Sequence, residues 1–344
     1  CLSFLLAGMM AVPSLPLPAF AADAAAGEEI AISAERFPDE QFRNYISEQL
    51  DSDGDNMLSA TECSEVVDLN VSQQGIADLT GIDVFSKLQQ LDCSGNTLSA
   101  LDISGAAQLL QLNCSANPDL SALKLPEKNG AFSFLVMLDC SDCALTELSL
   151  DSYALLGTLD CSGNQLAALD ISANSNLQTV DCSGNQLATL DVSANSNLQT
   201  VNCSNNQLTT LNFSQNAKLE EVDCSGNQLT ELDVYNALLQ KLDCSENALP
   251  SLFLSECSAL RELDCSQNQL VELDTTGLTL EILETAGNQR AIVPQPEQAG
   301  AYSYDLNNLP ELEQDRITGW ENASVKEDAA NVLQIPADTE RVSY

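Results

Sequence analysis

The chain has 344 residues, with 12 Lys and Arg against 51 Asp and Glu, which gives a formal net charge of −39 at pH 7. This charge argues against binding to nucleic acid or to anionic membrane surfaces, both of which need a basic surface, and it favours cationic partners and divalent cations. There is no His, so the commonest general base and the commonest metal ligand are both missing.

The first residues have the features of a secretory signal. Leu2–Val12 is apolar, and Ala19-Phe20-Ala21 offers a cleavage site with small residues on both sides. The apolar run is too short to span a membrane. We therefore expect a signal peptide over residues 1–21, truncated at its start, then an acidic, Ala-rich linker over residues 22–34. These features predict a protein that is secreted or attached to the cell surface and is not inserted in a membrane.

Residues 35–66 predict a helical cap. Phe37–Leu50 carries apolar residues on one helical face, and Pro38 suits a first helical position. The next twelve residues, Asp51–Glu62, match an EF-hand calcium loop, in which carboxylates, one carbonyl and one hydroxyl hold the ion. The expected ligands are Asp51, Asp53, Asp55, the Met57 carbonyl, Ser59 and Glu62.

The loop departs from the pattern at its sixth position, where Asn56 replaces Gly. Asn adopts the left-handed conformation more readily than most residues, so the Ca²⁺ prediction is kept. Leu58 is expected to pack beneath the loop. An acidic capping loop with no bound metal is the alternative.

From Val67 to Arg290 a phrase of about 21 residues recurs, L-x-x-L-x-C-S-x-N-x-L-x-x-L-D-[IV]-S. Its first eleven positions fit the leucine-rich-repeat pattern, with Cys in place of the sixth-position Leu. Val180 and Cys182 alternate with Asp181, which is strand periodicity, so Val180 and Cys182 should point inward and Thr179 and Asp181 outward. A single turn cannot bury its apolar face alone, so the turns must stack into an α/β solenoid with a parallel β-ladder.

Two columns follow from this stacking. The first holds Cys93, Cys114, Cys140, Cys161, Cys182, Cys203, Cys224, Cys244 and Cys265. Because in-register side chains run parallel, their Cβ atoms stay roughly 4.8 Å apart, too far for the usual disulfide, and we expect buried thiols rather than a metal or redox column. The second column holds an Asn three residues later in nearly every turn. Its amides should bond the open backbone groups of neighbouring turns.

This repeat resembles that of bacterial leucine-rich-repeat proteins with 21-residue units, sometimes called the IRREKO class and distantly related to the internalins. The resemblance covers about Val67 to Arg290, and the junction of helix, loop and first turn resembles the N-terminal caps of the same family. It implies a secreted or surface-attached protein with a binding role.

After Arg290 the period stops. Residues 291–344 include Pro294, Pro296 and the only Trp, Trp320. They are expected to form a C-terminal cap of irregular strand and short helix. The last residues resemble the middle of a strand, so further modules are expected beyond them. The five extra residues between Cys114 and Cys140 fall in Lys124–Phe134 and predict a surface loop.

Outward positions supply the candidate binding residues. The fifth position of each turn forms an acidic column, and a second Asp column follows the L-x-x-L segment. Hydrogen bonds from nearby Ser and Thr, or divalent cations between turns, could offset the repulsion between stacked carboxylates. Tyr235 and Phe253 replace the usual Ser and Asp in adjacent turns. They are expected to form either an exposed aromatic patch or edge packing under a return loop. The candidates are Asp160, Asp181, Asp223, Lys241, Asp243, Tyr235 and Phe253.

These features predict a monomeric, non-enzymatic module that recognises a protein or glycan at the cell surface. A passive surface spacer carrying further modules is the alternative. An enzyme is disfavoured because the visible chain offers no nucleophile paired with a base, and because near-identical Asp residues lack the contrasting environments that acid and base catalysis requires.

Overall fold

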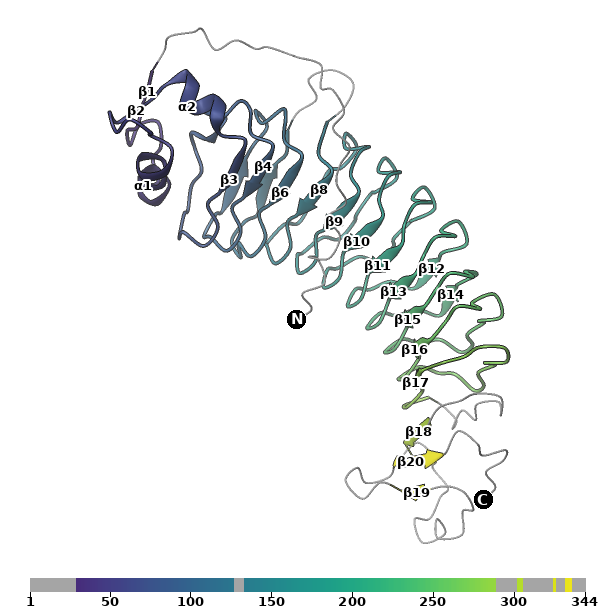
Figure 1. Ribbon diagram of the computed structural model, residues 1–344. Helices are drawn as coiled ribbons and strands as arrows, with labels where there is room; N and C mark the ends of the chain where they lie inside the picture. The colour runs from purple at the N-terminus through teal and green to yellow at the C-terminus, as the bar shows by residue number, and fades with distance from the viewer. Residues whose placement is uncertain (1–28, 127–132, 289–301, 306–323, 326–331, 336–344) are drawn as a thin grey trace.

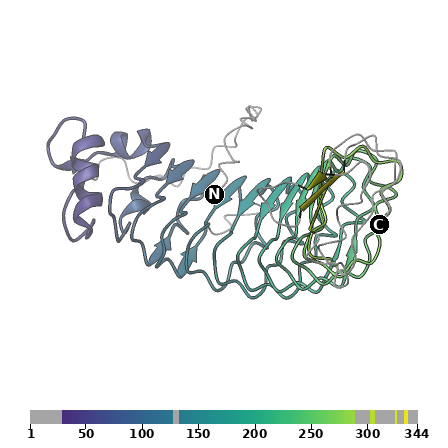
Figure 2. The same cartoon turned by 90° about the horizontal axis from the view of Figure 1, so that it is seen from below.

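A curved stack of parallel turns forms the body of the protein in the computed structural model (Figures 1 and 2). The structure describes residues 29–126 and 133–288 in full, and the backbone of three strands between residues 302 and 335. The predicted signal peptide, most of the predicted linker and the tip of the 124–134 insertion lie outside the described residues.

The main sheet has eleven strands, one from each turn, and all of its pairings are parallel. Val180 lies opposite Leu159 on one side and Val201 on the other, so equivalent residues of successive turns are in register. The strands are β3 (Asp68–Asn70), β4 (Gln90–Asp92), β6 (Gln111–Asn113), β8 (Met137–Asp139), β9 (Thr158–Asp160), β10 (Thr179–Asp181), β11 (Thr200–Asn202), β13 (Glu221–Asp223), β15 (Lys241–Asp243), β16 (Glu262–Asp264) and β17 (Ile282–Glu284). The predicted leucine-rich-repeat solenoid is confirmed.

Two smaller parallel sheets lie on the opposite side of the turns from the main sheet (Figure 1). One pairs β5 (Ala100–Asp102) with β7 (Ala122–Lys124), and the other pairs β12 (Thr210–Asn212) with β14 (Glu231–Asp233). They arise from the L-x-x-L-D part of the phrase, where one Leu stands between two outward residues and is buried in β5, β12 and β14 and partly buried in β7.

The core is a continuous apolar column, and the cysteines belong to it. Every cysteine from Cys63 to Cys265 is buried and free of disulfides. Burial raises the pKa of the Cys161 thiol well above its usual value and that of Cys265 to about 12. The predicted role of these thiols as small hydrophobic residues is confirmed.

The Asn column bonds successive turns as predicted. Asn185 Nδ2 donates to the carbonyls of Cys161 at 3.0 Å and Cys182 at 3.1 Å, and its Oδ1 accepts from the Leu166 amide at 2.9 Å. One turn carries Cys143 in this position, and its Sγ donates to the Cys114 carbonyl at 3.4 Å. Each amide therefore satisfies backbone groups that the core shields from water.

The N-terminal cap consists of α1 (Glu40–Gln49), α2 (Ala60–Glu65) and the antiparallel pair β1 (Ile30–Ala31) and β2 (Met57–Leu58). Helix α1 begins later than the sequence predicted, because Asp39 is its N-cap and the Asp39 side chain accepts a hydrogen bond from the Phe42 amide at 3.0 Å. Pro38 precedes the cap. Phe42 and Ile46 are fully buried, so the predicted apolar face covers the first turn. A short 3₁₀ helix, η1 (Ile82–Val84), lies in the first turn of the solenoid.

The cap also includes the end of the segment expected to be a linker. Ile30 and Ala31 pair with Leu58 and Met57, and Ile32 is buried. At the other end, β18 (Tyr302–Asp305), β20 (Val332–Ile335) and β19 (Ser324–Val325) form an antiparallel sheet in that order. The short helix expected in this C-terminal cap, together with Trp320, falls on residues outside the described ones.

Candidate functional site

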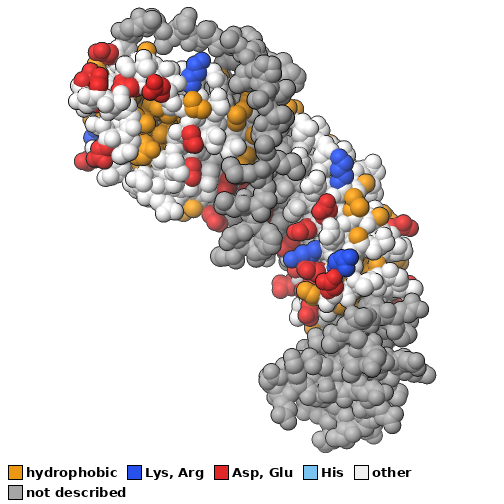
Figure 3. All heavy atoms as spheres, viewed as in Figure 1, with side chains coloured by type: hydrophobic (Ala, Val, Ile, Leu, Met, Phe, Trp, Pro, Cys, Tyr) orange, Lys and Arg blue, Asp and Glu red, His pale blue; other side chains and the backbone are white. Residues whose placement is uncertain are grey.

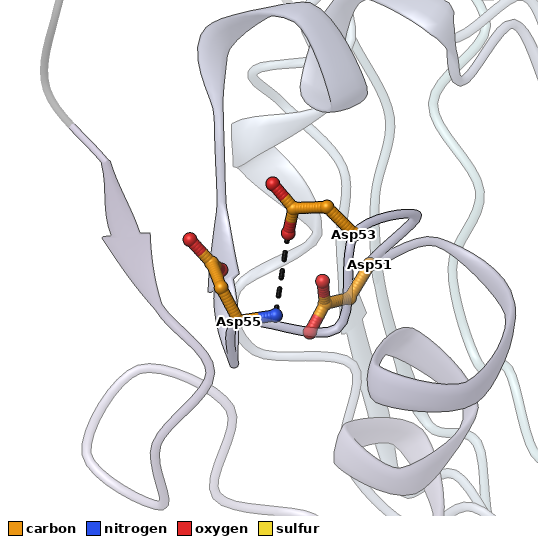
Figure 4. A group of neighbouring side chains, drawn as sticks. All are labelled: Asp51, Asp53 and Asp55. Atoms are coloured by element: carbon orange, nitrogen blue, oxygen red, sulfur yellow. Dashed lines mark hydrogen bonds between the residues drawn. The ribbon is translucent and has the colours of Figure 1, made fainter.

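The loop between α1 and β2 brings three carboxylates together. One oxygen from each of Asp51, Asp53 and Asp55 lies within 4.8 Å of the others (Figure 4). Asp51 accepts from the amides of Gly54 at 2.8 Å and Asn56 at 2.9 Å, and Asp53 accepts from the amide of Asp55 at 3.2 Å. These bonds fold the loop inward and hold the three like charges close.

The other loop predictions can be compared residue by residue. Asn56 has φ 66°, in the left-handed region, as expected of a residue in the Gly position. Leu58 is fully buried beneath the loop. Met57 lies in β2, and its amide donates to Asp55 Oδ1 at 2.8 Å.

Glu62, the expected last ligand, is turned toward two serines and lies outside the group of three carboxylates. Its Oε1 accepts from the amide and hydroxyl of Ser52, both at 2.7 Å, and its Oε2 accepts from the amide and hydroxyl of Ser59, both at 2.8 Å. Ser59 and Glu62 form a capping box at the start of α2. These hydrogen bonds, the one from the Ser59 amide first, lower the pKa of Glu62 to about 2.

Five of the seven candidate ligand-binding residues lie on the main sheet. The strand register stacks Asp160 between Asp139 and Asp181, and Asp223 beside Asp243. Each of these Asp residues accepts from the amide and hydroxyl of a Ser two positions later, as Asp160 does from Ser162 at 3.0 and 2.6 Å. Hydrogen bonding by neighbouring Ser residues, one of the two sources of relief considered from the sequence, is therefore present.

Burial and neighbouring carboxylates raise the pKa of two Asp residues in this column. Burial raises the pKa of Asp160 to about 6, and the Asp181 and Asp139 carboxylates add to the effect, while the bonds from Ser162 oppose it. Burial likewise raises the pKa of Asp223. Asn202 interrupts the column, and its Nδ2 donates to Asp181 Oδ2 at 2.8 Å. Asp160 and Asp223 therefore keep a proton to higher pH than an exposed Asp would.

Lys241 adds one cation to this surface. Its Nζ lies 3.7 Å from Glu262 Oε2, and both side chains are nearly half exposed. A pair exposed to this degree contributes little to stability. It makes the charge pattern locally mixed and does not form a separate site.

Tyr235 and Phe253 lie outside the main sheet, in segments that follow the L-x-x-L part of their turns. Their side chains are 52% and 67% exposed. Beside them a hollow of about 450 Å³ opens over β12 and β14. Its lining residues are Leu190, Asp191, Ser193, Thr210, Leu211, Asn212, Ser214, Gln215, Glu231 and Asp233. We call the hollow together with Tyr235 and Phe253 the outer surface.

The structure contains a second column of buried Asn residues that was not predicted from the sequence. Asn195 Nδ2 donates to the carbonyls of Ile171 and Asn174, both at 2.9 Å, and Asn216 repeats the arrangement one turn later. The repeated A-N-S-N-L segment was the available signal. These residues bind adjacent return loops together and are structural.

Comparison with known proteins agrees with this architecture. The family model described as "Endo-beta-N-acetylglucosaminidase EndoS LRR domain" matches residues 37–195, and a model of two leucine-rich repeats matches residues 196–237. The functional domain of InlJ from Listeria monocytogenes, which includes a cysteine ladder, is 29% identical with a TM-score of 0.65, and the alignment covers 76% of this chain and 62% of that one. YopM from Yersinia enterocolitica is 21% identical with a TM-score of 0.51, over 76% of this chain and 67% of that one. A search among curated proteins gave no match.

The fold and these similarities define a leucine-rich-repeat protein, a class of protein-interaction scaffold. The similarity to the functional domain of InlJ agrees with the internalin-like resemblance predicted from the sequence. The chain spans about 62% of the InlJ chain that it matches. Within the residues that the structure describes, no helix combines the length and the apolar character needed to cross a bilayer.

Proposed function

We propose that this protein is an extracellular, non-enzymatic module that recognises a protein or a glycan. The observation that carries the proposal is the main sheet, where eleven in-register strands present outward side chains at roughly 4.8 Å intervals. Turns bonded to one another by buried amides make this a rigid surface, and rigid surfaces lose little entropy on binding. The leucine-rich-repeat architecture, to which the family models and InlJ are both similar, supports a protein-interaction role.

The chemistry of the described residues supports the non-enzymatic part of the proposal. The thiols from Cys63 to Cys265 are buried, and their raised pKa values keep them protonated and poorly nucleophilic. The sequence has no His. Each of Asp160, Asp181 and Asp223 accepts a hydrogen bond from its own Ser two positions later, so these carboxylates are engaged by structural partners.

A passive surface spacer is the competing function, and affinity capture separates the two. The immobilised protein would be exposed to host and envelope extracts, and captured species would be titrated as purified components. A saturable partner whose binding weakens when Thr179 and Thr200 on the main sheet are changed to Arg supports recognition. Saturable binding to none of the components supports the spacer.

We also propose that the loop at Asp51–Glu62 binds Ca²⁺. Asp51, Asp53 and Asp55 converge within the distance at which one ion could contact all three, and oxygen ligands suit this ion. The Met57 carbonyl, Ser59 and Glu62 would complete the set. Bound Ca²⁺ would offset the repulsion among the carboxylates, and an acidic cap with no metal remains the competing proposal.

Titration calorimetry with CaCl₂ tests this site. We expect a single-site heat that disappears in the double variant Asp51→Ala plus Glu62→Ala and persists in the control Asp119→Ala, which removes a carboxylate from a distant turn. Equal heats in the double variant and the wild type would assign calcium uptake to other carboxylates and leave the loop as a cap.

A further inference from the structure

The outer surface combines features that the main sheet lacks. No aromatic residue occurs in the eleven main-sheet strands, whereas Tyr235 and Phe253 are largely exposed. Of the ten residues that line the adjoining hollow, Asp191, Glu231 and Asp233 are acidic and none is Lys or Arg. Over the face in view in Figure 3, acidic side chains likewise outnumber basic ones.

Two contacts place the aromatic residues at the end of the hollow. Asn236 Nδ2, one residue after Tyr235, donates to the Asn216 carbonyl at 2.7 Å, next to the lining residues Ser214 and Gln215. Cys257 Sγ, four residues after Phe253, lies 3.6 Å from the Val234 carbonyl. The segment that carries Tyr235 therefore packs against the turn that supplies Ser214 and Gln215, and the segment that carries Phe253 packs against the turn that supplies Asp233.

Some acidic residues on this side have a lowered pKa. Hydrogen bonds from the Ser193 side chain and amide lower the pKa of Asp191, and those from Ser172 and Thr276 do the same for Asp170 and Asp274. Asp160 on the main sheet behaves in the opposite way. A cationic partner would thus meet a carboxylate at Asp191 that stays charged to a lower pH than an unperturbed Asp.

We propose that the outer surface docks an arginine-bearing segment of a protein partner. Guanidinium groups pair with carboxylates through a planar fork and stack on aromatic rings, so one Arg-rich segment could use both the hollow and the rings. This inference rests on the proposed recognition function and assigns a partner chemistry to one surface of the module. A neutral glycan would use the rings and the polar lining but would gain nothing from the unpaired acidic charge.

The repeat supplies variants that separate this site from general charge attraction. Phe253→Asp and Tyr235→Ser install the residues that most other turns carry at these positions, so the fold should be retained. Phe253→Asp also adds a negative charge, which strengthens unspecific attraction of any cation. Leu155→Asn is the control, because it removes an exposed apolar side chain from a turn outside the outer surface and installs the residue that the next two turns carry at this position, Asn176 and Asn197.

The probe is a labelled extended peptide with four Arg residues, compared with versions that carry Lys or citrulline in their place, and binding is read by fluorescence anisotropy at physiological salt. We expect the Arg peptide to bind more tightly than the Lys peptide, and Phe253→Asp to weaken it about tenfold while Leu155→Asn leaves it unchanged. Circular dichroism would verify that the variants are folded.

Several results would overturn the proposal. Unchanged or tighter binding to Phe253→Asp would mean unspecific charge attraction, and equal binding of the Lys peptide would exclude stacking. Binding of a neutral oligosaccharide at these residues, with none of the Arg peptide, would assign the surface to glycans. If a captured partner binds wild type and both outer-surface variants alike, this inference fails while the proposed recognition function stands.

Discussion

Replacing Asn185 with Ala tests the claim that amide side chains, rather than apolar burial alone, hold the turns in register. Asn185 bonds three buried main-chain groups, and its Nδ2 also donates to the partly buried Ser183 carbonyl at 3.2 Å. Among the buried groups, the Leu166 amide donates to Asn185 Oδ1, whereas the two Cys carbonyls have second donors. Cys161 O also accepts from Asn164 at 3.1 Å, and Cys182 O also accepts from Asn206 at 2.9 Å.

The magnitude follows from this difference. A buried donor left without an acceptor costs about 1–3 kcal/mol, and each carbonyl that keeps one partner loses a bond worth about 0.5–1.5 kcal/mol. The free energy of unfolding should therefore fall by about 2–6 kcal/mol. The matched control is Asn195→Ala, which removes only two donor bonds and also removes an oxygen, Oδ1, that has no hydrogen-bond partner. We expect it to cost about 1–2 kcal/mol.

Urea denaturation of both variants, followed by circular dichroism, gives the comparison, and the slopes show whether neighbouring turns still unfold together. Hydrogen exchange at the Leu166 amide gives a local measurement, and this amide should exchange much faster in Asn185→Ala. Equal destabilisation by the two variants, or an unchanged Leu166 amide, would refute the assignment, because it would reduce both side chains to volume alone.

Further predictions concern the titratable groups. The pKa of Asp160 rises from 3.8 to about 6 on folding, so the folded state binds more protons than the unfolded state between these pH values, and stability falls as pH rises through this range. The variant Asp160→Asn should therefore stabilise the protein by at most roughly 3 kcal/mol at pH 8 and by little at pH 4. Thermal melting at a series of pH values measures this difference. The pKa of Glu62 is lowered from 4.5 to about 2, so the contribution of its carboxylate to stability is complete above pH 4.5 and is lost as pH falls toward 2. The variant Glu62→Gln should lower the melting temperature at pH 7 and remove this acid dependence. The buried thiols should react negligibly with Ellman's reagent at pH 8 until denaturant is added, and rapid reaction of the native protein would contradict their place in the core.

The sequence was sufficient for the repeating body because one physical requirement recurs in every turn. The slot held by Cys182 must be small and apolar, and the Asn three residues later must satisfy open backbone groups, so the period could be counted directly. The conformation of Asn56 was predictable for a similar reason, since the loop needs a left-handed residue there and few side chains allow it.

The ends were harder to predict because their structure depends on partners distant in sequence. The pairing of Ile30–Ala31 with Met57–Leu58 joins segments too short to show a period, so the first looked like linker. The start of α1 depended on whether Pro38 or Asp39 stands at the boundary, and the Asp39 hydrogen bond decides it. Tyr235 and Phe253 were visible as exceptions within the repeat, but the hollow beside them depends on how three turns lie together.

Glu62 shows why the candidate metal site could be predicted only in part. The segment from Ser59 to Glu62 satisfies two patterns at once, the end of a calcium loop and a capping box. The sequence cannot decide between them, because both use the same carboxylate oxygens. In the structure those oxygens accept four hydrogen bonds from Ser52 and Ser59. A calcium ion that recruits Glu62 must therefore compete with the capping box at the start of α2, which couples affinity at Asp51, Asp53 and Asp55 to the stability of α2.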